Sequence, residues 1–142
     1  MDTIRGALSV MRMSFDLPIA MWPITLSLFA LACWSSYKLI RLRRYRSMAS
    51  STLILSSCIV FLAVPFYAVA FWANHAVHTP DTQKLPTDVL GILMWGYIAL
   101  VALTVIIAKG YRLPLAGFAA FAVWMNYGIF LVSIMAVSGV WL

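Results

Sequence analysis

The stretch "STLILSSCIVFLAVPFYAVAFWA", residues 51–73, contains no formal charge. A helix needs about 20 mainly apolar residues to cross the roughly 30 Å hydrocarbon core of a bilayer, so this stretch predicts a transmembrane helix. Three further stretches of similar character predict spans at 17–40, 89–109 and 113–141. The sequence therefore predicts an all-α integral membrane protein, a four-helix transmembrane bundle that forms a single membrane domain over 1–142.

The composition of the whole chain agrees with this fold class. Of its 142 residues, 64% are hydrophobic and 10% are charged, against about 25% charged residues in soluble domains. A net charge of +6 would suggest nucleic-acid binding in a soluble protein, but here the basic residues stand at the ends of spans. The first apolar run exceeds the roughly 7–15 residues of a signal peptide core, so we expect it to stay in the protein. The sequence thus predicts contact with the lipid bilayer and no nucleic-acid partner.

The Lys and Arg residues are divided unequally between the two sides of the predicted bundle. Seven belong to one side, namely Lys38, Arg41, Arg43, Arg44, Arg46, Lys109 and Arg112, and three to the other, namely Arg5, Arg12 and Lys84. An excess of Lys and Arg marks the cytoplasmic side. We therefore expect both termini outside, most consistently in a bacterial inner membrane.

Four of these residues, Arg41, Arg43, Arg44 and Arg46, form a basic cluster between the first and second spans. We interpret the cluster first as an anchor that fixes the topology. A second interpretation is contact with anionic lipid headgroups, to which each basic residue contributes about 1 kcal/mol.

The segment 1–16 has an amphipathic pattern. Ile4, Leu8, Met11 and Phe15 recur at helical spacing, while Arg5 and Arg12 fall on another face. This pattern predicts a short helix in the outer membrane interface.

The fourth span concentrates small and polar residues on two faces. Ala119, Ala122, Asn126 and Ser133 share one face, and Gly117 and Gly128 belong to another. Small residues let helix backbones approach closely in lipid, and a buried amide seeks an interhelical hydrogen bond. We therefore predict two helix interfaces here, one within the chain and the other with another chain.

Candidates for chemistry are few. His75 and His78 stand three residues apart in the 74–88 connection and are weak candidates for metal ligands, because Pro80 follows them and no fourth ligand is near. No Asp, Glu, His, Lys or Arg falls inside the apolar centre of a span, which disfavours proton-coupled carriers and haem carriers. We expect no catalytic residues, no metal and no cofactor.

Two functions come first at this level, and a metal- or cofactor-associated accessory chain that uses His75 and His78 is a third. The first is a non-catalytic membrane subunit that packs with other membrane subunits or with copies of itself. The alternative is a homo-oligomeric pore, channel or holin-like effector lined by Ser, Thr and Asn.

Overall fold

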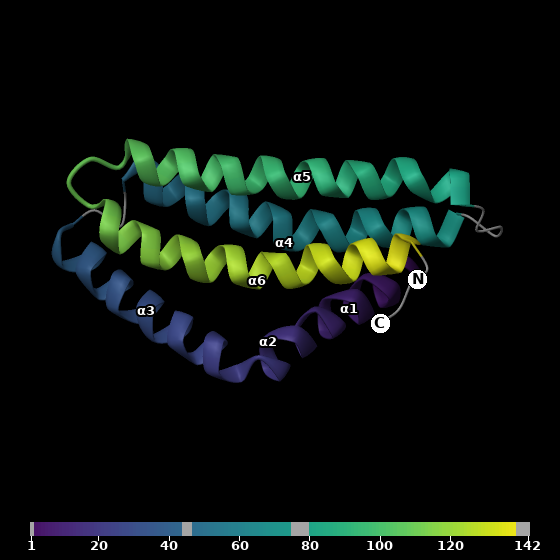
Figure 1. Ribbon diagram of the computed structural model, residues 1–142, viewed down its shortest axis with the longest axis horizontal. Coiled ribbons are helices and arrows are strands. Elements are labelled where there is room, and N and C mark those ends of the chain that lie inside the picture. The colour runs from purple at the N-terminus through teal and green to yellow at the C-terminus, as the bar shows by residue number, and fades with distance from the viewer. Residues whose placement is uncertain (1, 44–46, 75–79, 139–142) are drawn as a thin grey trace.

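The protein is all-helical. The computed structural model describes residues 2–43, 47–74 and 80–138. Its helices are α1 (Asp2–Ser14), α2 (Asp16–Ala20), α3 (Trp22–Arg41), α4 (Met48–Asn74), α5 (Pro80–Ile107) and α6 (Arg112–Ser138). The helices α3 to α6 are long and apolar enough to cross a membrane, and they pack as a bundle (Figure 1). This confirms the predicted four-helix bundle with a short N-terminal helix.

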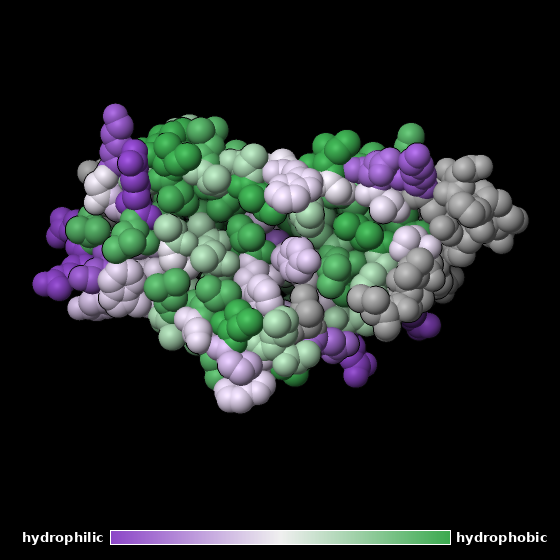
Figure 2. Space-filling view, in the orientation of Figure 1, coloured by the Kyte–Doolittle hydropathy of each residue, from purple (hydrophilic) through white to green (hydrophobic). Residues whose placement is uncertain are grey.

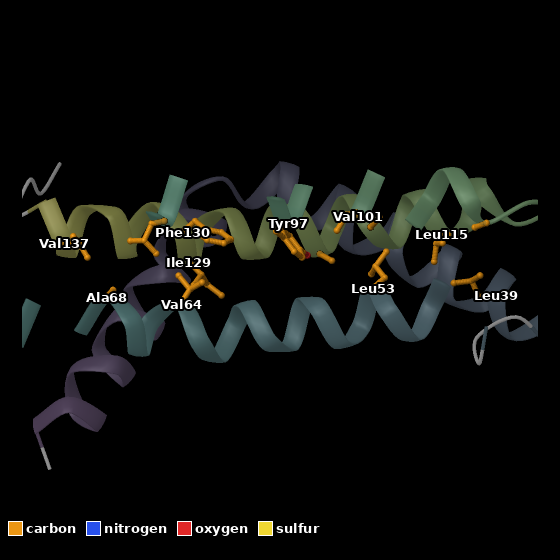
Figure 3. Close-up of a cluster of buried hydrophobic side chains, with 14 residues drawn as sticks. Leu39, Leu53, Val64, Ala68, Tyr97, Val101, Leu115, Ile129, Phe130 and Val137 are labelled. Carbon is orange, nitrogen blue, oxygen red and sulfur yellow. The ribbon is translucent and has the colours of Figure 1, made fainter. Parts of the chain in front are cut away.

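α6 is the central helix of the bundle. α3, α4 and α5 all pack against it, whereas α3 makes no backbone contact with α4 or α5 within the described ranges. Half of the apolar window of α6 is buried, 50% against 17–28% in the other three helices. The main core runs along α6 from Leu39 and Leu115 at one end to Ala68 and Val137 at the other (Figure 3).

The first predicted span, 17–40, is divided between α2 and α3. Pro23 lies in the first turn of α3, where a missing N–H costs nothing, so the helix starts here instead of continuing from α2. The Thr25 hydroxyl donates a hydrogen bond to the carbonyl oxygen of Pro18 at 2.8 Å. Thr25 Oγ1 in turn accepts one from Trp124 Nε1 at 3.1 Å. The Thr25 side chain therefore pairs a carbonyl oxygen at the break between α2 and α3 and links this break to α6.

α1 forms inside the segment predicted to be an amphipathic helix, and it packs against α4 and α6. Val10 and Ser14 are buried on its inward face. The predicted apolar stripe points elsewhere, because Ile4 and Leu8 are 58% and 59% exposed. α1 and α3 form the two arms of a V with α2 at its apex (Figure 1). Ile4 and Leu8 thus face away from the bundle, and the interfacial position of this helix remains a prediction.

One end of the bundle is basic. It is formed by the C-terminal ends of α3 and α5 and the N-terminal ends of α4 and α6, and we call it the basic end. Its described basic residues are Lys38, Arg41, Arg43, Lys109 and Arg112. Hydrophilic side chains gather at this end in Figure 2. The short turn from α5 to α6 uses Gly110 at a φ of 87°, a value that favours glycine, and it makes these two helices an antiparallel hairpin.

Candidate functional site

Three polar side chains meet near the middle of the bundle, one each from α4, α5 and α6. The Tyr97 hydroxyl lies 2.9 Å from Ser57 Oγ and accepts a hydrogen bond from Asn126 Nδ2 at 3.0 Å. Tyr97 and Asn126 are 6% and 4% exposed, and Tyr97 lies midway along the apolar core (Figure 3). We call these three residues the polar cluster. It joins the three helices through interhelical hydrogen bonds worth about 0.6–2 kcal/mol each in lipid.

The polar hydrogens of the three side chains in the polar cluster all take part in hydrogen bonds. The Ser57 hydroxyl donates to the carbonyl oxygen of Leu53 at 2.8 Å, so Ser57 Oγ accepts the hydrogen of Tyr97. The second Nδ2 hydrogen of Asn126 bonds to the carbonyl oxygen of Ala122 at 3.0 Å. This bond fixes the amide orientation, because a flipped amide would bring two oxygens together. Asn126 Oδ1 is left buried without a hydrogen-bond donor.

The six residues predicted for helix interfaces all lie buried in α6, namely Gly117, Ala119, Ala122, Asn126, Gly128 and Ser133. A Cβ on Gly117 would collide with Ser35 of α3, and one on Gly128 would lie 2.9 Å from the backbone oxygen of Ser14 of α1. The glycine face of α6 therefore contacts α1 and α3, and Asn126 faces α4 and α5. Both faces thus have neighbours within this chain, and an interface of α6 with another chain remains a prediction.

A shallow apolar trough lies between α3 and α5, with α6 as its floor. It holds about 810 Å³. Its small residues are Ala102 of α5 and Ala116, Ala119 and Ala120 of α6, and Leu28 lines it from α3. Because α3 and α5 make no backbone contact in the described part of the chain, the trough is open between them. We call it the α3–α5 trough.

A narrower groove lies on the other side of α3. The part toward the basic end lies between α3 and α4, holds about 200 Å³ and includes Ser50. The deeper part is lined by α4 and α6, holds about 390 Å³ and extends to Leu62 and Asn126. Ile54 and Phe118 line both parts, so the two adjoin, and we call them together the α3–α4 groove.

Two residues of the basic cluster, Arg41 and Arg43, follow the α3 residues that line the start of this groove. Arg41 ends α3 and Arg43 follows in the turn, and both side chains are exposed. Arg43 has a φ of 53°, a left-handed conformation that is uncommon outside glycine, and this reversal ends α3. Arg44 and Arg46, the other two residues predicted for the cluster, lie outside the described residues.

His75 and His78, the weak metal candidates, also lie outside the described residues. Within residues 2–43, 47–74 and 80–138, no three His, Cys, Asp or Glu side chains are grouped to hold a metal ion. The absence of a metal or cofactor remains a prediction.

Sequence reasoning identified Asn126 but missed its partners. Tyr97 stands in the middle of the 89–109 span, well away from the interfaces where tyrosines usually lie in membrane proteins. A phenol at that depth needs a hydrogen-bond partner. This signal could have paired Tyr97 with the one asparagine predicted at the same depth.

Comparison with known proteins identifies no family. No family model matches the chain, and neither the curated proteins nor the solved structures include one with significant similarity to it.

Proposed function

We propose that this multi-span membrane protein is a non-catalytic subunit that packs within a larger membrane assembly, either with different chains or with copies of itself. The observation that supports the proposal is the open α3–α5 trough. α3 is attached to the rest of the bundle only through α2 and α6 within the described ranges. One long side of α6 is thus left for a neighbour.

The lining of the trough suits a transmembrane helix. Ala102, Ala116 and Ala120 present small side chains over the floor and one wall. Small residues let a second helix backbone come close. In lipid there is no hydrophobic driving force between helices, so dispersion contacts at such close approach drive their association. We therefore place a partner helix with aliphatic side chains in this trough.

The polar cluster supports the non-catalytic part of the proposal. A serine or tyrosine nucleophile needs an adjacent base that takes its proton. Ser57 donates to a backbone carbonyl and Tyr97 donates to Ser57, and the third member is an amide. The cluster therefore holds helices together and offers no group that accepts a proton.

The alternative of a pore lined by Ser, Thr and Asn receives less support. Asn126 is 4% exposed and Ser133 is 0% exposed, and both lie inside a single chain. A lumen lined by these residues would require α6 to separate from α4 and α5. Ion conductance by the reconstituted protein alone would overturn our preference for the subunit function.

We further propose that the basic end faces the cytoplasm and that both termini lie outside. The proposal is supported by the seven-to-three division of Lys and Arg in the sequence. Single cysteines at Arg43 and Lys84, each introduced after Cys33→Ala and Cys58→Ala, provide a test. An impermeant maleimide applied to intact cells should label only the Lys84→Cys variant, and the opposite pattern would reverse the orientation.

The assembly itself is tested by filling the trough. Ala102→Leu and Ala120→Leu add bulk at exposed trough positions, and Ala63→Leu adds the same bulk at an exposed position of α4 outside it. Extraction in a mild detergent, followed by native mass spectrometry, should recover the wild type and Ala63→Leu in a complex and the trough variants largely alone. A wild-type chain that is monomeric after the mildest extraction would refute the proposal.

A further inference from the structure

The α3–α4 groove begins where the basic cluster begins. Leu39 and Ile40 line its first part from α3, and Ser50 lines it from α4. Arg41 and Arg43 follow directly after the α3 wall, and both are exposed. The turn after α3 therefore places positive charge at the mouth of an apolar groove.

The length of the groove corresponds to one leaflet of a bilayer. Its lining extends along α6 from Leu115 to Asn126 and along α4 from Ser50 to Leu62, which is about 16–18 Å at 1.5 Å per helical residue. Half of a hydrocarbon core of about 30 Å is about 15 Å. The groove thus starts at the basic end and stops near the middle of the membrane.

The N-terminal segment contacts the far end of the groove. The Phe15 ring packs against Phe61, with 6.3 Å between ring centroids, and Phe61 lines the deeper part of the groove. A transmembrane helix would need a path across both leaflets, so a groove of this length fits a lipid chain from one leaflet better.

The acidic residues of the chain lie away from the basic end. The sequence places seven Lys and Arg residues on this side. The four Asp residues, Asp2, Asp16, Asp81 and Asp88, belong to α1, α2 and the first part of α5. Within the described residues, no Asp therefore stands at the basic end to neutralise Arg41 and Arg43. Arginine binds phosphate oxygens in a bidentate manner, and anionic lipids collect beside such clusters.

From these observations we infer that the α3–α4 groove binds one anionic phospholipid from the leaflet at the basic end. Arg41 and Arg43 hold its phosphate, and one acyl chain lies first between α3 and α4 and then along α4 and α6 as far as Asn126. The inference is independent of the partner helix proposed above, because the groove and the α3–α5 trough lie on opposite sides of α3.

The test uses the full-length protein reconstituted in bilayers of equal parts phosphatidylcholine and phosphatidylglycerol. Native mass spectrometry after mild extraction should show one retained phosphatidylglycerol per chain. Arg41→Gln with Arg43→Asn removes two charges while asparagine tolerates the left-handed turn, and it should weaken retention about thirty-fold at about 1 kcal/mol per charge. Arg5→Gln with Arg12→Gln removes the same charge from the other side and should leave retention unchanged.

Groove-filling variants test the acyl chain separately from the phosphate. Ile54→Trp fills the shared middle of the groove, and Cys58→Phe fills its deeper part. Both should lose the lipid while keeping the helical circular dichroism and elution volume of the wild type. Ile92→Trp, at an exposed position of α5 outside the groove, should keep it.

Four results would overturn the inference. The first is retention that survives both changes at Arg41 and Arg43. The second is an equal loss in the Arg5 and Arg12 control, since the effect would then be the general attraction of a cationic protein. The third is displacement of the lipid by inorganic phosphate, which would show that the groove adds nothing. The last is an acidic protein bound at the cluster in place of lipid.

Discussion

The hydrogen bonds of the polar cluster predict that Tyr97→Phe loses more stability than Asn126→Leu, an order that side-chain packing alone would not predict. Tyr97→Phe removes one oxygen and leaves the ring in the core. The hydroxyl takes part in two interhelical hydrogen bonds, to Ser57 at 2.9 Å and to Asn126 at 3.0 Å. At about 0.6–1.7 kcal/mol for each bond in lipid, the variant should lose about 1–3 kcal/mol of unfolding free energy.

Removal of the amide should cost less than removal of the hydroxyl. Asn126→Leu deletes one interhelical bond but also deletes Oδ1, which is buried without a donor. An unsatisfied buried oxygen costs about 1–3 kcal/mol, and Tyr97 still donates to Ser57 in this variant. We therefore expect Asn126→Leu to lie within about 1 kcal/mol of the wild type, because the lost bond and the removed oxygen offset one another.

Reversible unfolding in mixed micelles with a rising fraction of sodium dodecyl sulfate measures both effects, with far-ultraviolet circular dichroism and tryptophan fluorescence as probes. Tyr127→Phe is the matched control, since Tyr127 is 41% exposed and takes no part in the cluster. Equal stability of Tyr97→Phe and Tyr127→Phe would show that the bonds contribute nothing. A larger loss of unfolding free energy in Asn126→Leu than in Tyr97→Phe would refute the assignment of donors and acceptors in the cluster.

The same unfolding assay checks three further predictions. Gly128→Ala should lose about 1–3 kcal/mol of unfolding free energy because its new Cβ meets a backbone oxygen of α1. Its control, Gly91→Ala, faces open space and should gain up to about 1 kcal/mol through higher helix propensity. An equal response of the two variants would contradict close packing of α1 on α6. Thr25→Val leaves a carbonyl of α2 and an indole N–H of α6 unpaired and should cost about 1–3 kcal/mol, while Ser27→Ala, whose hydroxyl bonds only within its own turn, should be nearly neutral. Ser47→Ala removes the hydroxyl that accepts the N–H of residue 50 at 3.2 Å, and loss of this N-cap should cost about 0.5–2 kcal/mol; no change would show that the cap is dispensable.

The spans were predictable because hydrocarbon leaves few choices. In lipid, the backbone N–H and C=O groups of a charge-free run such as 51–73 must form their hydrogen bonds within a helix. The length of the run then distinguishes a transmembrane helix from a shorter buried helix. The break between α2 and α3 was less accessible. Pro18 and Pro23 both occur in the run, but the proline signal alone does not distinguish a kink from a new helix. The decision depends on Thr25, whose bond to Trp124 joins residues far apart in the sequence.

The central position of α6 was only partly encoded in local pattern. Gly117 and Gly128 indicated close approach, and Asn126 indicated a buried bond, but neither feature names the helix on the other side. The small N-terminal helix is a neighbour that the pattern did not indicate. It contacts α6 through Ser14 against Gly128, and no sequence relationship between these two residues reveals the contact.

The central place of α6 also affects how the chain is made. A ribosome delivers α3, α4 and α5 before α6, and folding during synthesis ordinarily proceeds from the N-terminus. Here α3 has no backbone contact with α4 or α5 in the described residues, so it must wait in the bilayer for a helix that is translated later. A premature stop before Arg112 would therefore remove the scaffold on which every earlier span depends, and we expect such a product to be degraded by membrane quality control.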